Sequence, residues 1–142
     1  MNSHGSNYRM KEVMSELENK IEREVVRQLE EYFRGKRKEF ELPLDITGTP
    51  FEISVWRELM KIPYGETVTY SDIACRIGRE NAVRAVANAI GRNPLHIIIP
   101  CHRVTAKNGL GGFKAGIKNK IYLLELEKRF TIDSCPQKKS SF

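Results

Sequence analysis

The sequence predicts a mainly helical domain that contains a helix-turn-helix of winged-helix-like type, with a short strand leading to Cys101. Three observations support this class. Apolar residues recur at helical spacing in several segments. Threonine or asparagine caps precede these segments and glycines follow them. One short run, residues 95–99, is rich in isoleucine and bounded by prolines, which is typical of a strand.

Composition limits the class of protein. The net charge of +6 and the pI near 9.3 favour a polyanionic partner, although many basic proteins have none. The sequence has an odd number of cysteines at wide spacings, Cys75, Cys101 and Cys135, and no signal peptide precedes them. This pattern indicates a reducing compartment. No run approaches the roughly 20 apolar residues of a membrane span. We expect a soluble protein of the cytoplasm, or of the nucleus if the source is a eukaryote.

The N-terminal part divides into two segments. Residues 1–9 are polar and without period, so we expect a disordered leader. Residues 10–48 comprise a helix and an extended connector, in which Pro43 disfavours helix. The helix, from Met10 to Phe33, stops near Gly35, and its apolar face is Met14, Leu17, Ile21, Val25, Leu29 and Phe33.

The main domain is expected at residues 49–130 and opens with three capped helices. Thr49-Pro50-Phe51-Glu52 predicts a capping box and a helix to about Lys61. Thr69 caps a second helix, Tyr70 to Ile77, which Gly78 ends, and Asn81 caps a third, Ala82 to Ile90, closed by Gly91. The buried face of the first helix is Phe51, Val55, Trp56 and Leu59.

The second and third helices form a helix-turn-helix pattern. An ordinary helical hairpin in a core is an equally good interpretation of the pattern alone. The third helix is rich in small side chains, including Ala82, Ala85 and Ala87, and Arg84 projects from among them. A helix face without bulk can approach DNA closely, which favours the DNA interpretation.

The last part of the domain leads to and from Cys101. Leu95 to Ile99 should be a buried strand or extended segment that ends at Pro100-Cys101-His102. A glycine-rich loop at residues 108–116 contains Phe113, and a helix follows at residues 117–128. Residues 131–142 are expected to be a flexible tail. The last helix bears Ile121, Leu123, Leu124 and Glu127.

Cys101 followed directly by His102 is a candidate nucleophile, because an imidazole can take the thiol proton. Without further context, a buried inert cysteine is the more common case. A zinc site is excluded as an interpretation, because its ligands would be isolated cysteines and the scattered His4, His96 and His102. We expect no metal and no cofactor.

The run from Asn93-Pro94 to Ile99-Pro100-Cys101-His102-Arg103-Val104 resembles the active-site motif of the O6-alkylguanine-DNA alkyltransferases. Pro63 to Tyr70, Ala82 to Val86, and Leu123 to Glu127 also resemble landmarks of that family, in its order and spacing. The resemblance covers about residues 29 to 129.

The resemblance implies an irreversible, single-turnover transfer of a methyl or alkyl group to Cys101 from O6 of guanine, with O4 of thymine as a further target. His102 would be the base, acting through a water, and Glu127 would orient it. Asn93 would brace the backbone beside the cysteine, and Tyr70 would protonate the departing guanine. The implied partner is double-stranded DNA that contains an alkylated guanine. We expect the protein to bind it as a monomer and to have no membrane partner.

Further residues follow from the same resemblance. The base must be flipped out of the stack, and Arg84 would fill its place. DNA contacts are expected from Arg84, Ala82, Ala85, Ala87, Thr69 and Arg103, and the substrate pocket from Val104, Phe113, Lys114 and Ile90.

The sequence also departs from the family. Phe113 stands where a tyrosine is usual, the glycine loop is one residue shorter, and His96 and Lys114 are atypical pocket neighbours. The family's N-terminal half, which carries a zinc site in some members, is expected to be nearly absent.

Two other functions stay open. One is a non-catalytic alkyltransferase-like lesion sensor, in which the acceptor cysteine is replaced, whereas Cys101 is present here. The other is a helix-turn-helix regulator, against which the alanine-rich helix argues.

Overall fold

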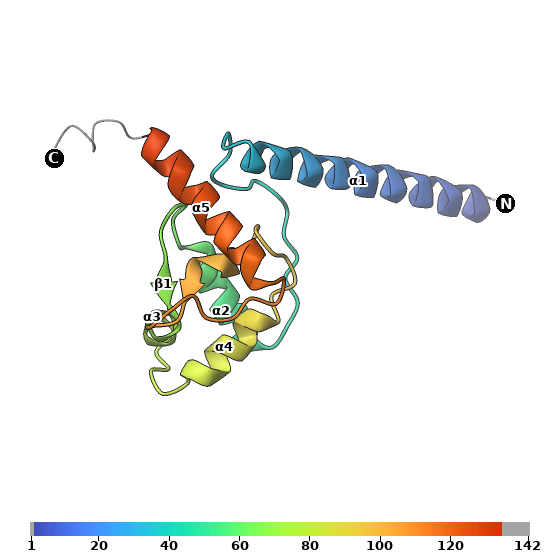
Figure 1. Cartoon of the computed structure of the whole chain (residues 1–142). Helices are drawn as coiled ribbons and strands as arrows, with labels where there is room; N and C mark the ends of the chain where they lie inside the picture. The colour runs from blue at the N-terminus through green and yellow to red at the C-terminus, as the bar shows by residue number, and fades with distance from the viewer. Residues whose placement is uncertain (1, 135–142) are drawn as a thin grey trace. The chain divides into compact units, whose positions relative to one another are not determined.

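The computed structural model describes the backbone of residues 2–134 and the side chains of residues 9–131. The chain forms two compact units, one up to Leu44 and one from Asp45 onward, whereas the sequence placed the second domain from Thr49. The predicted mainly helical class is confirmed (Figure 1). None of the described helices is both long and apolar enough to cross a membrane.

The first unit holds α1 (Asn2–Phe33) and the segment that follows it. The helix starts well before the expected Met10, so the prediction of a disordered leader is wrong for the backbone that the structure describes. No proline interrupts these residues, and adding residues to an existing helix is far easier than starting one. The end is as expected. Gly35 has φ 73°, and its N–H and that of Lys36 donate to Tyr32 and Glu31 carbonyls at 3.0 and 2.8 Å, a Schellman motif.

The segment after α1 is held to that helix by hydrogen bonds. The Gln28 side chain accepts from the Glu41 N–H at 2.9 Å and donates to the Glu41 carbonyl at 3.0 Å. The rings of Tyr32 and Phe40 lie 5.7 Å apart. In contrast, much of the expected apolar face of α1 is exposed, including Met14, Leu17 and Ile21.

The second unit begins with α2 (Pro50–Met60), whose start is as the sequence predicts. The Thr49 hydroxyl accepts from the Glu52 N–H at 3.1 Å, and the Glu52 carboxylate accepts from the Thr49 N–H at 2.9 Å. Val55, Trp56 and Leu59 are buried. The Trp56 indole donates to the Ala89 carbonyl at 2.9 Å, which fixes α2 against α4.

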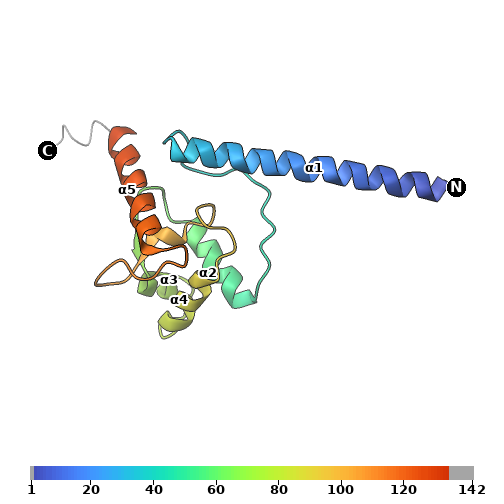
Figure 2. The same ribbon diagram turned by 45° about the vertical axis from the view of Figure 1, so that its right-hand side comes forward.

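The helix-turn-helix is formed by α3 (Tyr70–Arg76) and α4 (Val83–Gly91), which pack against each other and against α2 (Figure 2). Thr69 caps α3 as predicted, in a capping box with Asp72, and Gly78 follows with φ 73°. The predicted Asn81 cap is wrong, because Ala82 occupies the cap position and makes no side-chain bond. The connection is a longer turn, closed by the Ala82 N–H donating to the Arg79 carbonyl at 2.9 Å.

The strand predicted at Leu95–Ile99 is wrong. The Ile98 N–H donates to the His96 carbonyl and the Ile99 N–H to the Leu95 carbonyl, both at 2.9 Å, so this segment turns. Prolines at both ends lack donors, and the Asn93 side chain takes the Leu95 N–H. The two described strands are β1 (Val68–Thr69) and β2 (Val104–Thr105), a parallel pair that brackets the helix-turn-helix in sequence.

The chain reaches β2 through a short 3-10 helix, η1 (Cys101–Arg103), and ends its described part in α5 (Ile117–Ser134). The last helix runs beyond the expected Lys128, and the expected tail after Ser134 lies outside the described residues. Of the residues named for this helix, Leu123 and Glu127 are buried, whereas Ile121 is exposed. Lys120, which lies three residues before Leu123 and so on the same side of the helix, is buried.

Candidate active site

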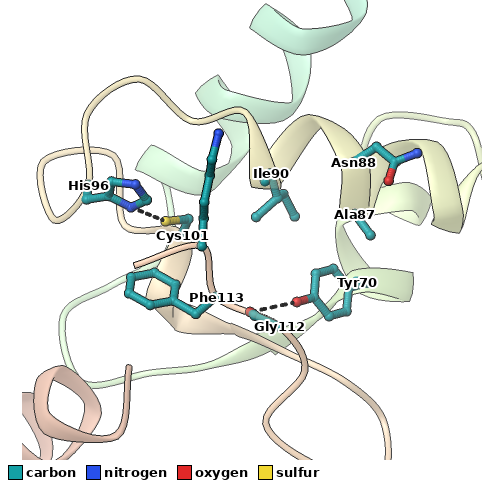
Figure 3. Close-up of a pocket in the computed structure, with 10 residues that line it drawn as sticks. Tyr70, Ala87, Asn88, Ile90, His96, Cys101, Gly112 and Phe113 are labelled. Carbon is teal, nitrogen blue, oxygen red and sulfur yellow. Dashed lines mark hydrogen bonds between the residues drawn. The ribbon is translucent and has the colours of Figure 1, made fainter. Parts of the chain in front are cut away.

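A pocket of about 320 Å³ lies between α3, α4 and the glycine-rich loop, with Cys101 in its wall (Figure 3). The predicted pocket residues Ile90, Phe113 and Lys114 line it. The prediction is wrong for Val104, which is fully buried in β2 and pairs with Val68. The remaining lining residues are Tyr70, Ala87, Asn88, Gly91, His96 and Gly112.

Cys101 opens η1 directly after Pro100 and is 3% exposed. Asn93 braces the backbone before it, since its amide donates to the Ile99 carbonyl at 2.8 Å and its oxygen accepts from the Leu95 N–H at 2.9 Å. Burial raises the pKa of Cys101, and a hydrogen bond from Asn93 and the charge of Lys120 offset this in part. The thiol is therefore held in its protonated form unless a base takes the proton.

The base and orienter expected from the sequence lie together. Nε2 of His102 is 2.5 Å from Oε2 of Glu127, and both side chains are buried. Since Glu127 is an acceptor, Nε2 carries the hydrogen and Nδ1 has the lone pair. Burial lowers the pKa of His102, against the opposing effect of Glu127. The imidazole is thus held neutral and in one tautomer.

Arg103 belongs to the same buried network. Its Nε and a terminal nitrogen donate to the Glu127 carboxylate at 2.8 and 3.0 Å, and its other terminal nitrogen donates to the Ile62 carbonyl at 2.7 Å. Its placement among the DNA contacts is therefore wrong. Burial alone would raise the pKa of Glu127, but the hydrogen bonds from His102 and Arg103 outweigh it and lower the pKa to about 2.

Tyr70 stands at the first position of α3 and lines the pocket. Its hydroxyl donates to the Gly112 carbonyl at 3.4 Å, and burial raises its pKa. Gly111 is required beside it. Its φ is 73°, and a Cβ there would lie 2.7 Å from the Tyr70 oxygen. The phenol therefore stays protonated, with its oxygen against the glycine loop.

Lys120 is a site residue that sequence reasoning missed. It is fully buried, and its ammonium donates to the carbonyls of Val104, Leu110 and Gly112 at 2.6, 2.5 and 3.1 Å. It therefore ties the glycine loop to β2. A signal was present, since Lys120 precedes Leu123 and Glu127 at helical spacing.

The residues expected to face DNA lie on and beside α4. Arg84 and Ala85 are exposed, while Ala82 and Ala87 are half-buried. Thr69 is half-buried, and its hydroxyl accepts from the Asp72 N–H at 3.1 Å. The outward face of α4 thus carries one long cationic side chain among small ones, next to the pocket that Ala87 also lines.

No group of three or more His, Cys, Asp or Glu side chains in the described part of the chain could hold a metal ion. The arrangement offers a thiol and a phenol in the wall of one pocket, and a buried imidazole–carboxylate pair whose imidazole belongs to the residue after the thiol. This suits nucleophilic attack by sulfur with proton transfer.

Two family models match the chain. Residues 50–129 match the DNA-binding domain of 6-O-methylguanine DNA methyltransferase, and residues 4–46 match the ribonuclease-like domain of the same family. The second match extends the resemblance seen in the sequence to nearly all of the first unit.

Curated relatives share the name methylated-DNA–protein-cysteine methyltransferase. A probable methylated-DNA–protein-cysteine methyltransferase of Acanthamoeba polyphaga mimivirus is 53% identical over 104 residues, covering 72% of this chain and 70% of the relative. The inducible methylated-DNA–protein-cysteine methyltransferase of Bacillus subtilis is 52% identical over 103 residues, covering 72% and 58%. The matched regions thus leave about a third or more of each relative uncovered.

Solved structures are also similar. OGT of Mycobacterium tuberculosis in complex with DNA has a TM-score of 0.74 and 50% identity, covering 75% of this chain and 67% of that one. Atl1 of S. pombe, solved with damaged DNA containing O6-carboxymethylguanine, has a TM-score of 0.51 and 28% identity, covering 58% and 79%.

Proposed function

The chain belongs to the 6-O-methylguanine DNA methyltransferase family, and on this premise we propose that it reverses alkylation damage in DNA by taking the alkyl group onto Cys101. The observation that carries the proposal is the position of Cys101, which lies in the pocket wall directly before His102 and Arg103, two residues that share the buried Glu127 carboxylate. The names of the relatives and the DNA-bound structure support it.

The proposed reaction is a single displacement. The Cys101 thiol gives its proton to an imidazole, for which we propose His102 acting through an intervening water, as the resemblance implies. The sulfur then forms a bond to the alkyl carbon while the bond from that carbon to guanine O6 breaks. The electron pair stays on guanine, which takes a proton from Tyr70, and the tyrosine regains one from solvent. A thioether is left, so each molecule acts once.

The proposed substrate is a guanine turned out of double-stranded DNA. The O6 atom is otherwise inside the base stack, and unstacking costs a few kcal/mol that contacts to the DNA must offset. The exposed Arg84 and the small Ala85 on α4 support this, because they could enter a groove next to the pocket. We also propose that the protein acts as a monomer.

The experiment is intact-mass spectrometry after incubation with duplex DNA that contains O6-methylguanine. We expect a mass increase of one methyl group, placed on Cys101 by peptide mapping, and no increase for the variant Cys101→Ser. A protein that binds the methylated duplex but gains no mass would contradict catalysis and support a lesion sensor.

A further inference from the structure

Two aromatic rings fill the space beside the Cys101 sulfur. Nδ1 of His96 lies 3.5 Å from Sγ of Cys101, and the His96 ring packs edge-on against Phe113, with ring centroids 5.4 Å apart and planes at 75°. Both rings line the pocket, and Figure 3 shows them on the same side of it as Cys101, with Asn88 and Tyr70 on the other side. The protein's own side chains therefore occupy the room around the sulfur at this end of the pocket.

The His96 ring is held in this place by the turn that carries it. The Asn93 side chain ties both ends of the turn, since it accepts from the Leu95 N–H at 2.9 Å and donates to the Ile99 carbonyl at 2.8 Å. Within the turn, Ile97 has φ 76°. A β-branched residue rarely adopts this left-handed conformation, and it does so where surrounding contacts impose it. The backbone is therefore fixed on both sides of His96.

The geometry of the proposed displacement makes this space matter for any alkyl group larger than methyl. The sulfur attacks the alkyl carbon from the side opposite guanine O6, so the S–C bond forms and the C–O6 bond breaks along one line. The other three substituents of the carbon then spread around this line, next to the sulfur. For a methyl group they are hydrogen atoms. For a benzyl group one of them is a flat ring, which must find room beside the sulfur.

A flat ring does not fit between His96 and Phe113 as they stand. Two aromatic faces that hold a third ring between them must be about 7 Å apart, which is twice the contact distance of about 3.5 Å between carbon atoms. The two centroids are 5.4 Å apart, and one ring meets the other by its edge, so the rings are already in contact. Cys101 is 3% exposed, so a group that bonds to its sulfur must come through the pocket.

We propose that His96, packed against Phe113, is a specificity-determining residue that restricts transfer to Cys101 to methyl and similarly small alkyl groups. This rests on the proposed function and names its substrate class. Proton transfer stays with His102. A benzyl carbon is intrinsically at least as reactive as a methyl carbon in a displacement, so slow benzyl transfer reports the shape of the pocket.

The first measurement needs no DNA. Iodomethane and benzyl bromide each alkylate a thiolate with loss of halide, and peptide mass spectrometry on the full chain gives both rates at Cys101. Exposed Cys75 in the same sample gives the benzyl-to-methyl ratio of an open thiol. Relative to Cys75, we expect Cys101 to disfavour the benzyl reagent by about tenfold or more, and His96→Ala to reduce this preference by about tenfold.

Two further variants separate the size of the ring from its other properties. His96→Phe keeps a ring and removes the nitrogen that contacts the sulfur, so it should keep the preference for the methyl reagent. Asn88→Ala is the matched control, since Asn88 lines the pocket on its other side and should leave the preference unchanged. Loss of the preference in His96→Phe would show that the hydrogen bond, and not the bulk of the ring, decides, and would contradict the proposal.

The second measurement is single-turnover transfer from one DNA duplex that carries either O6-methylguanine or O6-benzylguanine. We expect the parent protein to transfer methyl about tenfold faster than benzyl or more, and His96→Ala to narrow this difference by about tenfold. A benzyl-to-methyl ratio in His96→Ala within about twofold of the parent ratio in both measurements, with circular dichroism unchanged, would overturn the proposal. Failure of the parent protein to transfer methyl from DNA, with the halide preference still set by His96, would instead refute the proposed function alone.

Discussion

At the scale of single residues, the Glu127 carboxylate joins three parts of the second unit. It accepts from His102 of η1, from Arg103, and from the Gly65 N–H at 3.1 Å in the turn after α2. Each partner lies far from Glu127 in sequence. A buried carboxylate with this many donors is stable as an anion, and its loss would leave a buried guanidinium unpaired.

The variant Glu127→Gln tests this network. We expect a fall of about 3 kcal/mol in the free energy of unfolding, because the buried Arg103 loses its counter-charge while the shape is kept. Urea unfolding followed by circular dichroism measures it. Glu125→Gln, on the exposed side of the same helix, is the matched control and should change stability by about 0.5 kcal/mol or less. Equal effects of the two substitutions would refute the role of the network.

Residues of the site differed in how well the sequence predicted them. Cys101 and His102 stood out as an adjacent pair, the resemblance to the family implied their roles and that of Glu127, and the structure brings His102 and Glu127 together. Arg103 was misplaced among the DNA contacts, because its position is decided by burial and by its ion pair with Glu127, a residue 24 positions away in sequence. The Cys101 contact of His96 depends on a turn that residue types alone do not predict.

At the scale of elements, α4 has two unlike faces. Val86, Ala89 and Ile90 are buried in the core, and Arg84, Ala85 and Asn88 are exposed. Core packing fixes the rotation of the helix, so the small residues and Arg84 must point outward. The helix therefore links core packing to the surface beside the pocket.

This orientation gives a prediction for Arg84→Ala. We expect methyl transfer from duplex DNA to slow by roughly tenfold or more, because the variant loses one charged contact with the DNA. Transfer from the free O6-methylguanine base should change little, since a free base needs no flipping. Single-turnover assays on both substrates measure the split. Arg57→Ala removes the same charge from the exposed side of α2 and is the matched control. Equal slowing on both substrates would contradict the flipping role of Arg84.

Elements with local chemical signals were predicted well. The caps at Thr49 and Thr69 form as expected, because a capping box needs only residues close in sequence. The segment Leu95–Ile99 was mispredicted, because its isoleucines favour a strand while Asn93 and two prolines direct its backbone into a turn. The start of α1 was placed too late for a similar reason, since polarity alone does not end a helix.

At the scale of the whole molecule, the net charge of +6 suits a polyanionic partner, and the acidic residues decide how stability depends on pH. Among the side chains that the structure describes, Glu24 in the first unit and Glu127 in the second have a pKa lowered to about 2. The pKa of Glu24 is lowered chiefly by its hydrogen bond with Arg27 on the surface of α1, and salt screens this exposed ion pair. Glu127 is buried, so salt affects it little.

We therefore expect the second unit to lose stability on acidification in a window set by Glu127. Its pKa is about 2 in the folded chain against an ordinary value of 4.5, so the unfolded chain binds the proton first as pH falls. The stabilisation is complete above about pH 5 and is lost toward pH 2, amounting to about 3 kcal/mol. Burial also lowers the pKa of His102, which adds a further loss of stability on acidification that begins near the ordinary histidine pKa of 6.5.

Urea unfolding across this pH range in high salt, monitored by the fluorescence of Trp56 in α2, should show the decline in stability. The decline should be much shallower in Glu127→Gln, whose side chain does not titrate, and parallel curves for the two proteins would show that the buried carboxylate does not set the acid limit.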